Sequence, residues 1–305
     1  MVLWGCSESR SGLETFQPGT YEQTLDQRVY GFRRSYLLHI PQGYNRTTTF
    51  PLVVALHGGF GTAQRMERET GLSALADRER FLVLYPNGMT LFGWLQHWNA
   101  IHCCGKAMED GLDDVGFISM VIDQVRKNLK VNPARIYLLG YSNGGMLVHC
   151  LGAQKPETFA ALAVLSASIG SRPSPSDPEV RIPSPRGSVP VIAFHGREDN
   201  LVPYGGGRIK SWGHLYVPVK ESMDFWVQAN RCASIQQKEK LVGGKVLKET
   251  WRGEKRGEVV TLYTLEGWKH NLPTWYFTQG LPSTDPLKGF HATDIIWEFF
   301  KSHHR

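Results

Sequence analysis

The sequence predicts an α/β protein in which helices flank a mostly parallel central sheet, giving three layers. Short runs of β-branched or apolar residues alternate with longer amphipathic segments, as in chains built from βαβ units. Most of these apolar runs are continuous, which is typical of strands covered on both faces. A chain of 305 residues, 41% hydrophobic and 20% charged, is long enough for one large domain of this class.

The predicted elements follow one another in a single series. The expected strands are residues 35–40, 52–57, 81–85, 135–140, 162–166, 189–195 and 259–265. The expected helices are residues 64–78, 117–129, 144–153, 219–230 and 293–301. Residues 171–190 are rich in proline and serine, so we expect a long surface loop there. Without an internal repeat, we expect an N-terminal extension at 1–18 and a single domain over 19–305.

Charge and hydropathy exclude several classes of partner. The net charge is +6 and the pI about 9.0, but basic residues are spread along the chain, so nucleic-acid binding is not expected. No apolar run approaches the roughly 18 residues of a membrane span. The N-terminus lacks the features of an intact signal peptide. Residues 3–6 faintly resemble the end of a bacterial lipoprotein signal, so an arbitrary start, export and a lipid anchor at Cys6 all stay open.

Cysteine usage does not predict a metal site. The five cysteines have no C-x-x-C spacing, so we expect neither zinc nor another metal cofactor. The adjacent pair Cys103-Cys104 suggests one disulfide to a distant partner, for which Cys232 is the candidate. Buried or reduced thiols throughout are the alternative, and Cys150 fits that alternative because it lies in an apolar helical pattern.

The strongest chemical signal is the segment Gly140-Tyr141-Ser142-Asn143-Gly144. It follows an apolar strand and opens a helical pattern, which is the context of a nucleophile elbow. Small residues at the flanking positions allow the close chain passage that this strained turn requires. We therefore expect Ser142 to be a nucleophile. The alternative is that this segment is a glycine-rich turn that packs one βα unit without a catalytic role.

A serine nucleophile needs a base, and the base needs an acid to orient it. Asp199 lies just past the expected strand 189–195, where a side chain emerges at the carboxyl edge of a parallel sheet. Glu198 is the neighbouring alternative. His270 follows the last expected strand, and we expect it to be the base. Ten other histidines exist, and those near the final helix are expected to be solvated.

An oxyanion hole would complete this machinery. One donor is expected to be the backbone amide of Asn143, and the other that of Gly59 or Phe60 in the segment Leu56-His57-Gly58-Gly59-Phe60-Gly61. Sequence does not decide between these two. Trp98, Trp268 and Trp275 are candidates for a substrate pocket, with core packing as the alternative.

With these residues in view, the chain resembles the polyhydroxybutyrate depolymerase and feruloyl or acetylxylan esterase type of α/β hydrolase. The segments that carry the resemblance are Leu56-His57-Gly58-Gly59, Trp98-Asn99, Cys103-Cys104-Gly105, Asp113-Asp114-Val115-Gly116-Phe117, Gly140-Tyr141-Ser142-Asn143-Gly144-Gly145-Met146 and His195-Gly196 ahead of Asp199. The resemblance implies the α/β-hydrolase fold, the same three catalytic residues, a bridge from the cysteine pair to Cys232, and an exported protein. One segment departs from the family, because residues 267–273 read Gly-Trp-Lys-His-Asn-Leu-Pro instead of Gly-Gly-Gly-His-Thr-Trp-Pro.

These observations predict a serine esterase that acts without a cofactor through an acyl-enzyme. Feruloyl or acetyl esters of plant polysaccharide, or related small esters, are the expected substrates, and hydroxyalkanoate oligomers are the alternative. A serine peptidase or a noncatalytic carbohydrate-binding protein is a less favoured hypothesis. The sequence makes no prediction of oligomeric state.

Overall fold

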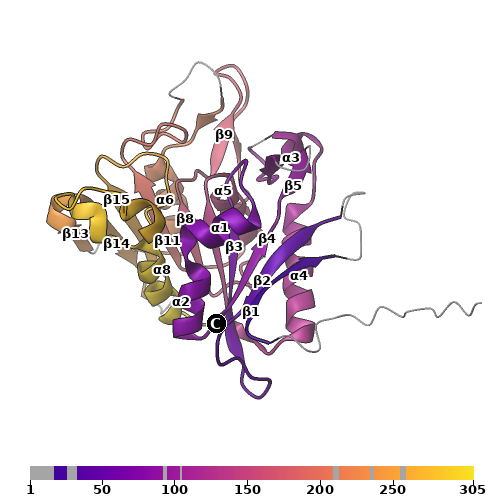
Figure 1. The fold of residues 1–305 in the computed structure, drawn as a ribbon. Helices are drawn as coiled ribbons and strands as arrows, with labels where there is room; N and C mark the ends of the chain where they lie inside the picture. The colour runs from indigo at the N-terminus through magenta and orange to yellow at the C-terminus, as the bar shows by residue number, and fades with distance from the viewer. Residues whose placement is uncertain are drawn as a thin grey trace, which may run out of the picture.

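The computed structural model describes residues 17–25, 33–91, 95–103, 105–208, 213–233, 237–254 and 259–305. A ten-stranded sheet crosses the molecule in the order β1-β2-β4-β3-β7-β8-β11-β15-β14-β13 (Figure 1). Its strands are β1 Gly19–Thr24, β2 Ser35–Ile40, β3 Phe50–Leu56, β4 Leu82–Pro86, β7 Val131–Tyr141, β8 Ala161–Leu165, β11 Val191–Gly196, β13 Gln237–Leu241, β14 Val246–Arg252 and β15 Val259–Leu265. Strands β4, β3, β7, β8, β11 and β15 pair in parallel, and the outer strands are antiparallel. The predicted mostly parallel sheet is confirmed.

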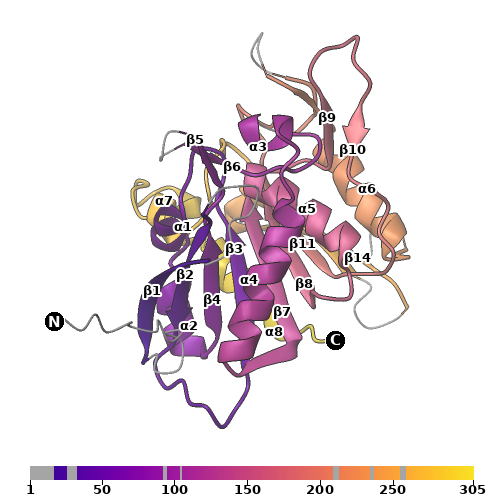
Figure 2. The ribbon, with the colours of Figure 1, turned by 90° about the vertical axis from the view of Figure 1, so that its right-hand side faces the viewer.

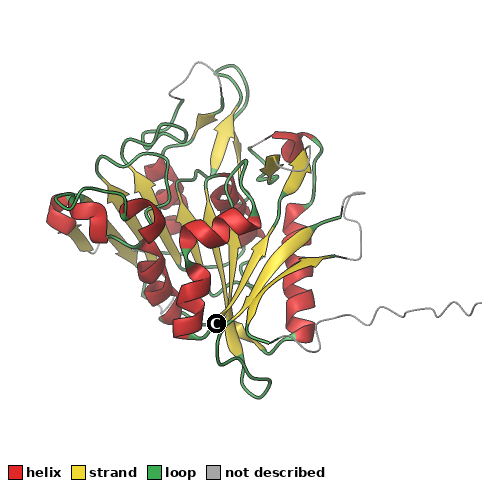
Figure 3. Ribbon diagram, in the orientation of Figure 1, coloured by secondary structure: helices red, strands yellow, loops and turns green. Residues whose placement is uncertain are grey.

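Helices cover both faces of this sheet (Figures 2 and 3). They are α1 Ala63–Thr70, α2 Leu72–Glu79, α3 Gly105–Glu109, α4 Asp114–Asn128, α5 Asn143–Gln154, α6 Val219–Ala229, α7 Trp275–Thr278 and α8 Ala292–Lys301, with short 3₁₀ turns at Val242–Gly244 and Pro286–Gly289. One hydrophobic cluster lies under α4, α5 and α6, and a second under α1, α2 and α8. The three predicted layers are therefore present.

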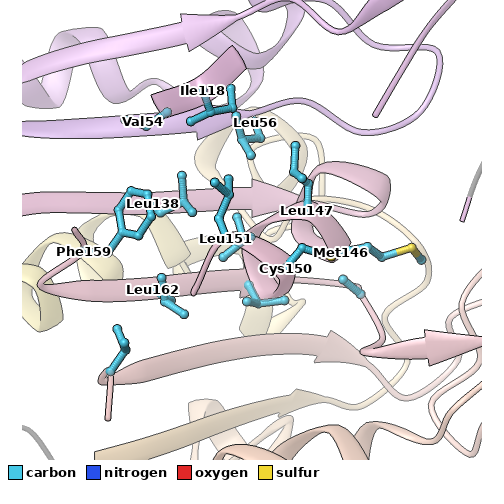
Figure 4. Close-up of a cluster of buried hydrophobic side chains, with 14 of the residues drawn as sticks. Val54, Leu56, Ile118, Leu138, Met146, Leu147, Cys150, Leu151, Phe159 and Leu162 are labelled. Atoms are coloured by element: carbon cyan, nitrogen blue, oxygen red, sulfur yellow. The ribbon is translucent and has the colours of Figure 1, made fainter. Parts of the chain in front are cut away.

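Alternation along the central strands explains why both clusters exist. In β3, Val54 and Leu56 face the first cluster, whereas Val53 and Ala55 face the second. Successive side chains of a strand point to opposite faces, so a continuous apolar run supplies both layers. Figure 4 shows the first cluster, where Leu147 and Leu151 of α5 lie against strand residues such as Leu138 and Leu162. This packing fixes α5, and with it the turn that opens the helix.

The predicted helix at 64–78 is two helices. Gly71 separates α1 from α2 in the left-handed conformation, with φ 66°, and its amide donates to the carbonyl of Glu67. Glycine adopts this conformation readily, so it ends one helix and starts the next. The predicted loop at 171–190 also contains regular structure. Short strands β9 Gly170–Arg172 and β10 Val180–Arg181 form a small sheet with β12 Leu215–Tyr216.

The parallel strands bring four chain segments to one edge. Leu56 of β3 pairs with Gly140 of β7, and His195 of β11 pairs with Thr264 of β15, so all four strands end at similar heights. The segments that follow them contain the glycine-rich loop at 57–61, Ser142, Asp199 and His270. None of the described helices is long and apolar enough to cross a lipid bilayer.

Candidate active site

Ser142 occupies a strained turn between β7 and α5. Its backbone lies at φ 53° and ψ −122°, an uncommon conformation for a residue with a side chain. The turn is also crowded. A Cβ on Gly140 would lie 2.4 Å from the carbonyl oxygen of Gly144, and one on Gly144 would lie 2.3 Å from that of His57. Only glycine fits at both positions.

The structure brings Ser142, His270 and Asp199 into one chain of hydrogen bonds. His270 Nε2 lies 2.8 Å from Ser142 Oγ, and His270 Nδ1 lies 2.7 Å from Asp199 Oδ2. Asp199 is buried, whereas the alternative acid Glu198 is exposed and makes no contact with the imidazole. The geometry is that of a nucleophile, a base and the acid that orients the base.

Four N–H groups surround the carboxylate of Asp199. Its Oδ1 accepts from the amides of Leu201 at 2.9 Å and Val202 at 2.8 Å. Its Oδ2 contacts His270 and also His195 Nε2, at 3.3 Å. Burial raises the pKa of Asp199, but hydrogen bonds from His195 and His270 outweigh burial and hold that pKa far below its usual range. The carboxylate is therefore ionised when it faces the imidazole.

Two residues that support the catalytic residues, His195 and Tyr141, were not predicted from the sequence. His195 Nε2 lies 2.9 Å from the carbonyl of Val202 as well as near Asp199, so it holds the acid loop closed. Tyr141 Oη donates to the carbonyl of His270 at 2.8 Å, and the two rings pack 5.2 Å apart. Both belong to motifs that sequence analysis had singled out, namely His-Gly ahead of the acid and the residue before the nucleophile.

Two backbone amides near the serine, those of Asn143 at the start of α5 and of Gly59 in the loop after β3, are the candidates for an oxyanion hole. The amides of Asn143 and Gly59 donate to no acceptor among the described residues. The amide of Phe60 instead donates to the carbonyl of Gln96 at 2.8 Å. Of the two alternatives left open by the sequence, the geometry therefore favours Gly59, because its amide is available for an oxyanion.

His57 holds the glycine-rich loop in place. Its Nδ1 donates to the carbonyl of Gly58 at 2.7 Å, and its Nε2 accepts from the amide of Gly88 at 3.0 Å. Burial lowers the pKa of His57 to about 4, so the ring is neutral near pH 7. Accepting the Gly88 amide requires that neutral form.

The side chain of Asn143 joins the nucleophile turn to the segment after β6 (Leu95–His97). Its Oδ1 accepts from the amide of Trp98 at 2.7 Å, and its Nδ2 donates to the Trp98 carbonyl at 3.0 Å. The Trp98 ring in turn donates to the carbonyl of His57 at 2.8 Å. These bonds connect the nucleophile turn to the loop that contains Gly59.

A cavity of about 440 Å³ opens over Ser142 and His270. Its wall is largely apolar and aromatic, with Phe60, Met66, Tyr141, Leu201, Tyr216 and Phe277 among the lining residues. The size fits a small ester or one end of a larger substrate.

None of the three predicted tryptophans lines this cavity. Trp98 is fully buried, because its backbone and ring hold the loops described above. Trp268 is buried and donates to the carbonyl of Asn271 at 2.9 Å. Trp275 is 59% exposed at the start of α7, from which Phe277 reaches the cavity instead. The pocket assignment of these residues is corrected accordingly.

The cysteines only partly follow the prediction. Cys103 is buried and disulfide-bonded. The Sγ of Cys232 contacts the carbonyl of Asn230 at 3.8 Å as a thiol donor, so the structure does not show the bridge to Cys232. Cys104 and Cys6 lie outside the described residues. Within the described ranges, no group of three or more His, Cys, Asp or Glu is placed to hold a metal ion.

Known proteins resemble this chain in sequence over much of its length. Residues 34–175 match the family model described as Esterase PHB depolymerase. Putative esterase NocK of Nocardia uniformis subsp. tsuyamanensis is 33% identical over 185 residues, covering 58% of this chain and 48% of that protein. Feruloyl esterase B of Piromyces equi is 26% identical over 247 residues, covering 78% of this chain and 42% of that protein.

Solved structures share the fold of this chain. Acetyl xylan esterase from Aspergillus awamori superposes with a TM-score of 0.61 at 15% identity, covering 92% of this chain and 99% of that one. This likeness, together with the sheet and its flanking helices, shows the α/β-hydrolase fold. The chain spans less than half the length of the two curated relatives named above.

Proposed function

We propose that this protein is a serine carboxylic-ester hydrolase. The observation that carries the proposal is the continuous hydrogen-bonded chain from Ser142 through His270 to Asp199, beside the available amides of Gly59 and Asn143. The family match and the relatives named as esterases support it. Residues 19–305 are proposed to act as one catalytic domain, since the main sheet takes strands from Gly19–Thr24 to Val259–Leu265.

The geometry accounts for each step of ester hydrolysis. His270 removes the proton of Ser142 Oγ as the oxygen attacks the ester carbonyl, and the amides of Gly59 and Asn143 bind the resulting oxyanion. His270 then protonates the departing alcohol and leaves an acyl group on Ser142. A water molecule, deprotonated by His270, releases the acid. Throughout, the ionised Asp199 stabilises the imidazolium that forms in both half-reactions.

The substrates are proposed to be feruloyl or acetyl esters of plant polysaccharide or related small esters. Named relatives and a structural neighbour of these types support this class. Hydroxyalkanoate oligomers are the second candidate, favoured by the description of the matching family model. A serine peptidase and a noncatalytic carbohydrate-binding protein are less favoured, because the relatives compared are named as esterases.

We further propose an exported protein, with anchoring at Cys6 as an alternative to free secretion.

Active-site labelling tests the proposal directly. A fluorophosphonate probe should modify Ser142, and Ser142→Ala should abolish both labelling and hydrolysis of p-nitrophenyl acetate while the circular dichroism spectrum stays unchanged. Peptide mapping would identify the labelled residue. Turnover that persists in Ser142→Ala would point to another nucleophile, and a folded wild-type protein that is never labelled would favour a binding protein.

A further inference from the structure

The cavity over Ser142 contains few groups with a permanent charge. Of the described residues that line it, Arg65, Glu69 and Arg208 are the Arg, Lys, Asp and Glu side chains. Arg65 Nε donates to Glu69 Oε1 at 2.6 Å, so these two charges largely compensate each other. Glu69 is buried, and its carboxylate is held against α1 by this pair.

Arg208 differs from Arg65 because it has no such partner. Among the described residues, no carboxylate or other acceptor forms an ion pair or hydrogen bond with its guanidinium. The backbone beside it is nevertheless fixed. The amide of Gly207 donates to the carbonyl of Tyr216 at 2.8 Å, and the Tyr216 amide donates back at 2.9 Å. Tyr216 also lines the cavity, so this pairing holds Arg208 at the cavity wall.

Two of the cavity histidines, His97 and His214, do not supply the same charge. Burial lowers the pKa of both His97 and His214 below the usual histidine range. Both rings are therefore neutral near pH 7. With Arg65 compensated by Glu69, Arg208 is the uncompensated cation of the described cavity wall.

We propose that Arg208 binds a carboxylate of the substrate, so that the preferred esters carry a negative charge on the acyl or alcohol side. The inference rests on the proposed esterase function and narrows its substrate class. A guanidinium can donate two parallel hydrogen bonds to a carboxylate, and such charge-assisted bonds are stronger than neutral ones. The apolar wall, including Phe60 and Leu201, would pack against the uncharged body of the same molecule. Half-esters of dicarboxylic acids and hydroxyacid oligomers with a free acid end have this composition.

Two matched pairs of esters test the proposal. Monoethyl adipate is compared with its neutral isostere, in which a methyl ketone replaces the free carboxylate. Para-carboxyphenyl acetate is compared with para-acetylphenyl acetate, which moves the same change to the alcohol side. For each pair, kcat/KM is measured by chromatography of the products, and the anionic-to-neutral ratio is compared between proteins. Intrinsic differences in ester reactivity cancel in that comparison.

Three variants make the comparison specific. Arg208→Gln should lower the anionic-to-neutral ratio by about fivefold or more in at least one pair, and Arg208→Glu should lower it further. The ratio is the readout, because a change in kcat/KM that affects both esters of a pair equally cancels in it. Arg126→Gln is the charge-matched control, because Arg126 lies in the last turn of α4, near the edge of the sheet opposite Ser142. Added salt should reduce the ratio of the wild-type protein, since it screens an exposed charge.

An equal ratio in wild type and Arg208→Gln, for both pairs, would overturn the inference while leaving esterase function intact. The same holds if Arg126→Gln lowers the ratio as much as Arg208→Gln, because the effect would then come from net charge alone. Failure of the wild-type protein to hydrolyse any of the four esters would instead count against the proposed function itself.

Discussion

Acidification from pH 7 to pH 5 should destabilise the folded protein, because three fully buried histidines must stay neutral. Burial lowers the pKa of His57 to about 4, and that of His102 and of His149 to about 3. Two of the rings also use an unprotonated nitrogen as an acceptor. His57 Nε2 accepts from the amide of Gly88 at 3.0 Å, and His149 Nδ1 accepts from the Trp226 ring at 2.9 Å. Protonation would break these bonds.

The magnitude follows from linkage between proton binding and folding. An unfolded histidine titrates near pH 6.5, whereas these folded ones do not bind a proton until well below pH 5. The pKa values are lower in the folded state, so stability is lost as the pH falls below the unfolded value. Each ring then costs about 0.7 kcal/mol between pH 7 and 6, and about 1.2 kcal/mol between pH 6 and 5. Three rings together lower the free energy of unfolding by roughly 5–6 kcal/mol. The lowered pKa of Asp199 adds little here, because its unfolded value lies near 3.9.

Urea unfolding at pH 7, 6 and 5 measures this loss. In His149→Gln, where a side-chain oxygen replaces the acceptor, the loss between pH 7 and 5 should shrink by about 2 kcal/mol. His304→Gln is the control, because that histidine is exposed, and its pH dependence should match that of the wild type. Equal stability at pH 7 and 5, or NMR titration of these three rings near pH 6.5, would refute the reasoning.

Four substitutions test the geometry of the site. Asp199→Asn should lower kcat roughly 10³–10⁴-fold without unfolding the protein, and a larger loss in Glu198→Gln would reassign the acid. Tyr141→Phe removes the hydrogen bond to the His270 carbonyl, so we expect kcat to fall about three- to tenfold with little change in KM; an unchanged kcat would show that this bond does not position the base. Gly144→Ala places a Cβ 2.3 Å from the carbonyl oxygen of His57, which should lower stability by about 1–3 kcal/mol in thermal unfolding, and an unchanged melting temperature would mean that the elbow can relax.

The central strands could be predicted from sequence because their burial leaves a plain pattern. Strand β3 and the second half of β7 are apolar runs, β15 is buried along its whole length, and all three were expected within a few residues of where they lie. The outer strands carry no such pattern. Gly19–Thr24 alternates half-buried and exposed side chains, and Gln237–Leu241 is rich in lysine and mostly exposed, so both resemble loop sequence. Their strand character comes from pairing with a neighbour, which sequence does not display.

The candidate site divides in a similar way. Ser142, Asp199 and His270 were expected together because each follows a parallel strand, and such strands end at one edge. The residues that support them were missed, since the contacts of His195 and Tyr141 depend on how separate loops fold against each other. The same limit explains the tryptophans. The sequence near a motif does not distinguish a large aromatic residue that lines a cavity from one that, like Trp98, connects two loops by hydrogen bonds.

The bonds between Asn143 and Trp98 bear on how the substrate range of this protein could be altered. His97, which lines the cavity, is the immediate neighbour of Trp98, whose backbone is tied to the residue proposed to supply an oxyanion amide. Engineering at positions 95–98 to admit new esters would therefore tend to lower turnover for every substrate at once. Phe277 also lines the cavity, but its amide donates to the carbonyl of Thr274 beside α7, so this position is the better starting point for a mutant library.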